Sequence, residues 1–490
     1  MEDEDDLQAS AYDSNDVSSN GSYRPVSHRL HRSPRGIWLV LLLLLLVNLT
    51  NGITSIPLSR LLERRLCRIY YDTDGDVDEE LCKVDKVQQD LAWIVGFFET
   101  LWIVGDFVMT IPLTFVSERY GRKKVLLLNL TPRLFMLAWI LSISYLDDYL
   151  PPRAAIAGAA LSVLGGDTVF NSLVYGLASK MAENDTTRAI YFSRMTALTS
   201  VIGFLSPAVA AASMTIRSSL PFWLGVVFLL LAVPTIWLLP ADADSRMETI
   251  EARRPLISSP TLKAQASRRS LVASVTARVH LLISSVTNRQ LALLLLSMLL
   301  TSLASADTKL LPQYISKRYH WTFASAGYLL SGKALLNFFL LTFVVPTFLA
   351  RRAHTSQSLS DKANVRYARF CLVASVVGAL AIALSSFIWE LVPSLLIYAL
   401  GVPLSIFTLS LANSSALWAR GSDVVDTGHP PNHVFSVVMM VKTIGSLIGA
   451  PFMATLWYYG IRVSFYGSPY IASSLIYLVA YCVFWNICLD

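Results

Sequence analysis

Charged side chains lie inside long apolar stretches of this sequence. Glu99 and Asp106 are seven positions apart, so both lie on one face of a helix. Asp167 follows two glycines in another apolar stretch, and Asn171 lies one helical turn later on the same face. A charge in the middle of a membrane helix costs about 3 kcal/mol on insertion scales. These residues are therefore candidates for function.

The two central acids, Asp106 and Asp167, suit proton chemistry. A carboxylate in a partly dry cavity can take up and release protons near neutral pH, as proton-coupled transport requires. We expect Glu99 to line the outer vestibule of the same cavity. The alternative for Asp106 is that it is a structural acid paired with Lys or Arg of a neighbouring helix, since buried ions are commonly paired. For Asp167, a packing role beside its glycines fits the sequence equally well.

The second half of the chain carries cations in comparable positions. Lys333 and Asn337 share a face of one apolar stretch, and Lys442 lies in the first turns of another. A cation that faces a cavity attracts an anionic substrate or neutralises a buried acid, and we expect Lys333 to contact substrate. Asp307 and Lys309 are expected near the outer end of their stretch, where a lysine can extend its ammonium to the membrane surface.

An all-helical membrane architecture must position these residues. Of the 490 residues, 54% are hydrophobic and 15% are charged, whereas soluble domains carry roughly a quarter charged residues. A helix needs about 20 apolar residues to cross a bilayer. The sequence predicts twelve such helices, at 37–56, 91–114, 125–145, 154–178, 189–213, 221–239, 290–312, 323–349, 367–388, 392–416, 434–459 and 469–488.

The polar segments divide the chain into two halves. Residues 1–35 are too poor in apolar side chains to fold and predict a disordered cytoplasmic tail. A six-helix half follows over 36–239, with an external loop at 57–90. A basic cytoplasmic loop over 240–289 then precedes a second six-helix half over 290–490.

Lysines and arginines concentrate in the tail, the central loop and the short loops on the same side. The positive-inside rule therefore predicts that both termini are cytoplasmic. Topology also accounts for the net charge of +6, so we expect no nucleic acid partner. We expect the plasma membrane in preference to the vacuole. Cys67 and Cys82 share the external polar segment, where a disulfide between them would persist.

The loop after the second predicted helix carries a specific motif, Glu118-Arg119-Tyr120-Gly121-Arg122-Lys123. Gly121 permits a tight turn there. The motif resembles the loop between the second and third helices of the major facilitator superfamily, with Glu118 in place of Asp. The resemblance implies that Glu118, Arg119, Gly121, Arg122 and Lys123 form a cytoplasmic latch between the halves. The alternative is a basic loop that serves topology only.

Small residues and prolines of two further helices are similar to the same family. Gly203 and Pro207 resemble part of an exporter motif, and Gly445, Gly449 and Pro451 lie in the corresponding helix of the second half. The resemblance implies a role in packing and gating, although plain helix packing explains these residues nearly as well. The Gly-Gly-Asp run in the fourth predicted helix resembles a fungal efflux-type branch related to the proton-coupled folate and haem carriers.

The resemblance implies a function as well as a fold of two pseudo-symmetric six-helix halves. We expect a secondary active transporter that exports a small organic molecule, a drug or secondary metabolite, against proton entry by alternating access. A proton-coupled importer and a transport-dead nutrient sensor are the alternatives. The sequence holds no phosphate-binding loop or nucleophile–base pair, so we expect no enzyme activity, no cofactor and no metal. The expected partners are substrate, protons and the lipid bilayer, and the chain is expected to be a monomer.

Overall fold

The computed structural model describes residues 35–239 and 289–487, apart from positions 74, 76, 147–148, 162, 182–184, 345–356 and 413–433. The predicted tail, up to residue 34, and residues 240–288 of the predicted central loop lie outside the described residues. Within the described ranges the regular structure is entirely helical. The expectation of an all-α membrane protein is thereby confirmed.

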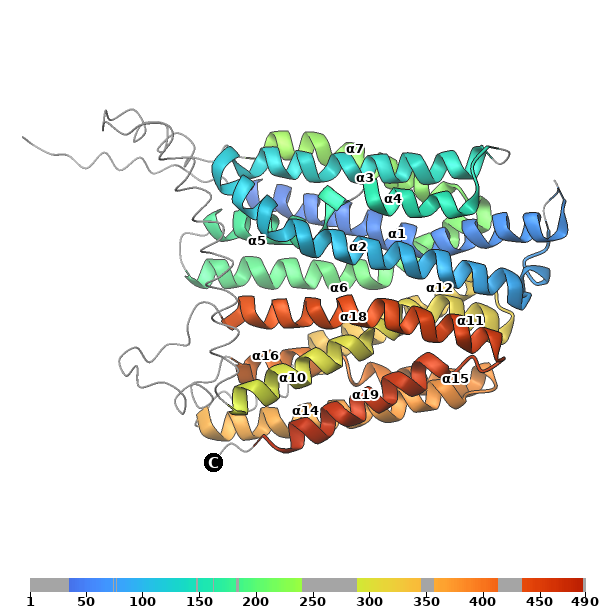
Figure 1. The fold of residues 1–490 in the computed structure, drawn as a ribbon. Helices are drawn as coiled ribbons and strands as arrows, with labels where there is room; N and C mark the ends of the chain where they lie inside the picture. The colour runs from blue at the N-terminus through green and yellow to red at the C-terminus, as the bar shows by residue number, and fades with distance from the viewer. Residues whose placement is uncertain are drawn as a thin grey trace, which may run out of the picture.

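The helices form two bundles that lie side by side (Figure 1). The first bundle contains α1 (Arg35–Tyr71), α2 (Asp85–Tyr120), α3 (Arg122–Tyr145), α4 (Ala155–Leu161), α5 (Asp167–Met181), α6 (Asp185–Ile216) and α7 (Leu220–Leu238). The second contains α10 (Arg289–Ala304), α11 (Leu311–Tyr319), α12 (Phe323–Phe339), α14 (Gln357–Leu384), α15 (Ile388–Ala399), α16 (Leu404–Ala412), α18 (Val434–Arg462) and α19 (Ser468–Trp485). The bundles meet where α2 packs on α18 and α6 packs on α12.

Eleven helical segments of the described chain are long and apolar enough to cross a membrane. The predicted helix 154–178 differs, because it is broken into α4, a short 3₁₀ turn η3 (Val163–Gly165) and α5. Gly165 lies at this break, and a Cβ added to it would lie 3.1 Å from Cγ of Arg133. The glycine thus lets the chain approach α3 closely where its regular hydrogen bonding stops.

The predicted loop 57–90 is largely helical, because α1 continues to Tyr71 and α2 begins at Asp85. A polar residue ends a membrane helix when its side chain must reach water. Glu63 does not need to, because protein groups donate to it in the interior. Its buried carboxylate accepts from Arg60 at 3.0 Å, Lys83 at 2.7 Å and Gln88 at 2.6 Å. The polar sequence therefore marks an internal charge cluster as well as a loop.

A disulfide joins Cys67, near the end of α1, to Cys82 in the short 3₁₀ turn η1 (Leu81–Lys83). Their Cα atoms are 5.3 Å apart. Both cysteines are buried in a small apolar cluster with Val87. This disulfide end of the bundle lies opposite the end at which the described chain starts and finishes (Figure 1).

Each half has its own apolar core, and small residues bring particular helices together. A Cβ on Gly445 or Gly449 of α18 would lie 2.6 Å from a carbonyl oxygen of α10. Between membrane helices such van der Waals packing replaces the hydrophobic effect, since lipid is as apolar as the helices. Pro451, in the same helix, is half-buried.

Gly203 does not share this packing role, because nothing lies within 4 Å of the position of its missing Cβ. Instead, α6 approaches α12 through Gly327, where an added Cβ would lie 3.1 Å from Cβ of Ala211 and 3.3 Å from the carbonyl oxygen of Pro207. Pro207 therefore lies at the contact between the halves, one turn beyond Gly203.

Candidate functional site

Two adjoining cavities lie in the centre of the molecule. One, of about 420 Å³, lies between the halves and is lined by α2, α5, α18 and the 3₁₀ turn η4 (Ser305–Lys309) that follows α10. The other, of about 460 Å³, lies within the second half. Ser305, Thr308 and Lys442 line both. The first is called here the interface cavity and the second the inner cavity.

Asp106 reaches from α2 to the start of α5 across the interface cavity. Its carboxylate accepts the Thr168 hydroxyl at 2.7 Å and the Thr168 backbone N–H at 3.1 Å. A helix N-terminus has unpaired N–H groups and a partial positive charge, so a carboxylate is stabilised there. Gly166 makes the approach possible, because an added Cβ would overlap the Asp106 carboxylate.

Asp167, the first residue of α5, forms an ion pair with the buried Arg133 of α3, with an N–O distance of 2.8 Å. Asn51 of α1 links the two, since its amide donates to Asp167 at 2.7 Å and accepts from Arg133 at 3.0 Å. Arg133 is 1% exposed. Asp167 therefore lines the interface cavity and also pairs with a cation, Arg133, which the sequence did not suggest as its partner.

Asn129 satisfies the backbone that the break in the fourth predicted helix leaves open. Its amide donates to the carbonyl oxygens of Gly166 at 3.1 Å and Leu164 at 3.3 Å, and its oxygen accepts from Arg133 at 3.2 Å. Non-helical backbone at membrane depth is tolerated when protein groups satisfy it in this way. Specific side-chain hydrogen bonds therefore stabilise the break between α4 and α5.

Glu99 also lines the interface cavity, where it pairs with Lys309 of η4 at 3.4 Å. The pair crosses from one half to the other. Lys309, which was expected to extend its ammonium to the membrane surface, faces the Glu99 carboxylate in the lining of the interface cavity. The side chain of Lys309 is 64% exposed, so this pair contributes little to stability.

Asp307 lies two residues before the end of the apolar segment Arg289–Lys309, and it is fully buried in the second half. It accepts the Tyr398 hydroxyl at 2.8 Å and 3.1 Å, and that hydroxyl lies 3.3 Å from the hydroxyl of Tyr477. Lys333 Nζ lies 5.1 Å from the centre of the Tyr398 ring. The 3₁₀ geometry of η4 turns Asp307 and Lys309 to different surroundings.

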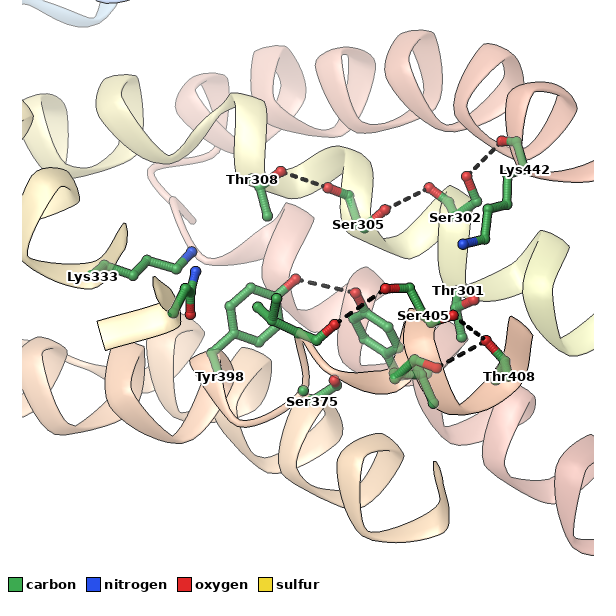
Figure 2. A pocket seen from close by; sticks show the side chains of 15 residues that line it. Thr301, Ser302, Ser305, Thr308, Lys333, Ser375, Tyr398, Ser405, Thr408 and Lys442 are labelled. Atoms are coloured by element: carbon green, nitrogen blue, oxygen red, sulfur yellow. Dashed lines mark hydrogen bonds between the residues drawn. The ribbon is translucent and has the colours of Figure 1, made fainter. Parts of the chain in front are cut away.

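The inner cavity is lined mainly by hydroxyl groups, with Lys333 and Lys442 as its cations. Figure 2 shows the two lysine side chains entering from opposite ends with their ammonium groups directed toward the middle. Asn337 also lines this cavity. Asn171 of α5 is half-buried and lies outside the lining of both cavities.

The predicted latch lies where α2 ends and α3 begins. Gly121 separates the helices with a φ of +90°, a conformation that favours glycine. Lys123 donates to the carbonyl oxygen of Leu239, in the same half. A Cβ on Gly176 of α5 would lie 3.3 Å from the guanidinium of Arg122. Glu118 and Arg119 lie in the last turns of α2, and their side chains are outside the described residues.

At the disulfide end, polar contacts join the two halves. Lys83 donates to the Ser316 hydroxyl at 2.5 Å, and Lys317 pairs with Asp85 at 2.5 Å. The Glu79 carboxylate accepts the backbone N–H of Phe323 at 2.8 Å. Residues 79–85, at and just after the Cys67–Cys82 disulfide, therefore contact the start of α12 and the end of α11.

Sequence reasoning missed four residues of this site: Arg133, Asp307, Tyr398 and Gly96. A signal existed for the first two, because both are charged and lie inside predicted helices. Gly96 is where α2 crosses α18, and a Cβ there would lie 2.5 Å from Cβ of Ala454. No local pattern identifies such a crossing.

The chain is similar to known membrane transporters. The family model of the Major Facilitator Superfamily matches residues 88–450. The MFS efflux pump atnC of Emericella nidulans is 25% identical over 446 residues, which cover 87% of this chain and 83% of that protein. The efflux pump ustT of Aspergillus flavus is 24% identical over 460 residues, covering 89% and 85%.

Solved structures share the fold. The human organic anion transporter MFSD10 (TETRAN) superposes with a TM-score of 0.56 at 18% identity, covering 92% of this chain and 99% of that chain. The nucleoside transporter NupG superposes with a TM-score of 0.61 at 14% identity, covering 92% and 98%. At these identities the likeness concerns the arrangement of helices.

Proposed function

We propose that this chain, which belongs to the Major Facilitator Superfamily, exports a small organic molecule in exchange for protons. It is a multi-pass membrane transporter and not an enzyme. One observation carries the proton assignment. Asp106 faces the interface cavity, and no ion pair among the described residues includes it. Hydrogen bonds from Thr168 stabilise the charged form of the Asp106 carboxylate. A proton that enters the cavity can bind to this carboxylate without first displacing a cation.

Proton binding at Asp106 would loosen the first half. A protonated carboxyl loses the charge that attracts the N-terminus of α5 and becomes a donor itself. The contact between α2 and α5 would weaken, while Asp167 remains neutralised by Arg133. Since α2 also packs on α18 of the other half, a change at Asp106 can reach the interface between the halves.

Alternating access supplies the transport step. The halves rock about the central cavities, and discontinuous helices such as the α4–α5 pair line the site. Opening at the disulfide end requires the contacts of Lys83 with Ser316 and of Lys317 with Asp85 to break. The Glu99–Lys309 pair also spans the halves and would separate.

We place the disulfide end outside the cell. A disulfide persists in an oxidising compartment, and the positive-inside rule assigns the opposite end, with both termini, to the cytoplasm. The plasma membrane fits this orientation. We propose a monomer, because both cavities are built from one chain.

Export is favoured over import by the names of similar proteins, two of which are called efflux pumps. The direction can be tested in cells preloaded with two fluorescent dyes, fluorescein and rhodamine 6G. Expression of the chain should lower the retained amount of at least one dye, and a protonophore should abolish the difference. Higher retention on expression would support the importer instead. Equal retention of both dyes, with the protein present in the membrane, would count against transport of such molecules.

A further inference from the structure

The inner cavity holds a chemical arrangement that proton transfer at Asp106 does not use. Its volume of about 460 Å³ is in the range of small-molecule sites. Polar side chains dominate its lining. They are Thr301, Ser302, Ser305, Thr308, Lys333, Asn337, Ser375, Tyr398, Ser405, Thr408, Lys442 and Tyr477.

Most cations around the two cavities already have an acidic neighbour. Arg133 forms an ion pair with Asp167, and Lys309 forms one with Glu99. Lys333 interacts electrostatically with Asp307. No ion pair among the described residues includes Lys442. The nearby acid Asp106 is satisfied by Thr168. Lys442 is therefore a cation that lines both cavities and is available to an anion from outside the protein.

The hydroxyl groups offer mainly acceptors to this cavity. A hydroxyl has one donor and two acceptor sites. The Ser302 hydroxyl donates to the backbone carbonyl oxygen of Lys442 at 2.6 Å (Figure 2). The Ser305 hydroxyl donates to the backbone carbonyl oxygen of Ser302 at 2.9 Å, and the Thr308 hydroxyl to that of Ser305 at 2.8 Å. With their protons committed to the backbone, these oxygens can accept hydrogen bonds from a ligand.

Asn337 adds a second observation that points to a ligand. Its side-chain oxygen is buried and has no hydrogen-bond partner, although the residue lines the cavity. A buried amide oxygen without a partner is costly, so such a group is expected to be satisfied when the site is filled. Its natural partner is an O–H or N–H group.

We propose that the inner cavity binds a hydroxylated organic carboxylate. Lys442 pairs with the carboxylate, and the hydroxyl oxygens and Asn337 accept from the ligand's O–H groups. A phosphate is disfavoured, because a dianion would need a second available cation, and the other lysine of this cavity, Lys333, has Asp307 as an acidic neighbour. The proposal rests on the proposed transport function and names its substrate class.

Binding to the purified full-length chain in detergent tests the proposal with three probes. Gallate carries a carboxylate and three hydroxyls, gallamide replaces the carboxylate by a neutral amide, and benzoate lacks the hydroxyls. We expect gallate to raise the unfolding temperature most and to bind at least tenfold more tightly than the other two by calorimetry. A hydrogen bond to a charged group is worth roughly a factor of ten or more in affinity.

Matched variants separate the charge of Lys442 from general effects. Lys442→Gln should remove the advantage of gallate over gallamide, and Lys442→Arg should keep it. Lys86→Gln, at an exposed lysine in the first turn of α2, should behave as wild type. Equal binding of gallate and gallamide, no binding of gallate, or an unchanged preference in Lys442→Gln would each overturn the proposal. The assay uses no gradient, so failed proton coupling or reversed direction would not affect its result.

Discussion

The two halves hold their buried charges in different ways. In the first half, a guanidinium and the N-terminus of a helix neutralise Asp167 and Asp106. In the second half, Asp307 accepts from the hydroxyl of Tyr398, and Lys333 lies on that ring. A guanidinium fork has fixed geometry, whereas a hydroxyl rotates and can donate or accept. The first half thus offers a rigid frame for a proton site, and the second an adaptable lining for a substrate.

The rigid frame should depend most strongly on Arg133. Arg133→Leu removes the cation beside Asp167, whose side chain is 38% exposed, and leaves the amide oxygens of Asn51 and Asn129 without their donor, so we expect the free energy of unfolding to fall by about 2–4 kcal/mol. Denaturant unfolding of the purified protein measures this loss. Arg133→Lys keeps the charge but not the fork and should lose less. A stable Arg133→Leu protein would mean that the frame does not need its cation.

The corresponding test in the second half removes one hydroxyl. Tyr398→Phe deprives the buried Asp307 carboxylate of one of its donors and should cost about 1.5–3 kcal/mol in the same measurement. Tyr477→Phe should cost less, because within the described part of the chain the Tyr477 hydroxyl forms its hydrogen bond with the Tyr398 hydroxyl, at 3.3 Å, and not with the carboxylate. If both variants lose the same amount, the carboxylate is not the group that the tyrosines stabilise.

Crowding at the break between α4 and α5 sharpens the contrast. The Cβ added in Gly166→Ala overlaps the Asp106 carboxylate, so we expect about 1–3 kcal/mol of destabilisation and loss of pH-dependent dye export. Gly203→Ala is the matched control, since open space surrounds that position. It should be neutral or stabilise by up to about 1 kcal/mol. Normal export by Gly166→Ala would show that Asp106 tolerates displacement.

The pair that joins the halves should matter least for stability. Lys309→Gln removes the bond to Glu99, and its 64% exposed side chain implies a loss of about 0–1 kcal/mol. Unfolding of the variant measures the loss, with Lys86→Gln as the surface control. A loss as large as that of Arg133→Leu would mean that the interface, and not the frame of the first half, stabilises this conformation.

Much of the architecture follows from the sequence, because apolar length alone predicts membrane helices. The same rule could not foresee that the predicted helix 154–178 breaks at Gly165, since its apolar length continues through the break. Nor could it foresee that α1 extends to Tyr71, because the polar residues there are satisfied by distant partners such as Lys83. A hydropathy scale assigns a value to each residue and takes no account of a distant partner that neutralises its charge.

The sequence predicted the acids that line the candidate site but not the groups that bind them. Rarity of charge inside apolar stretches pointed to Asp106 and Asp167, and both line the interface cavity. The partners of these two acids could not be predicted, because each belongs to another helix. Arg133 of α3 pairs with Asp167 of α5, and Thr168 of α5 donates to Asp106 of α2. The burial of Asp307 could not be predicted either, because its donor Tyr398 belongs to a distant helix, α15.

The central claim, that Asp106 couples proton movement to export, is tested most directly in proteoliposomes. A pH gradient is imposed, and the accumulation of whichever dye the cells export is followed over time. Wild type should accumulate the dye against its gradient only when the pH gradient is present, and Asp90→Asn, a carboxylate of α2 outside both cavities, should do the same. Asp106→Asn should let the dye equilibrate without responding to the pH gradient. Gradient-driven accumulation by Asp106→Asn, at equal protein amounts, would contradict the account.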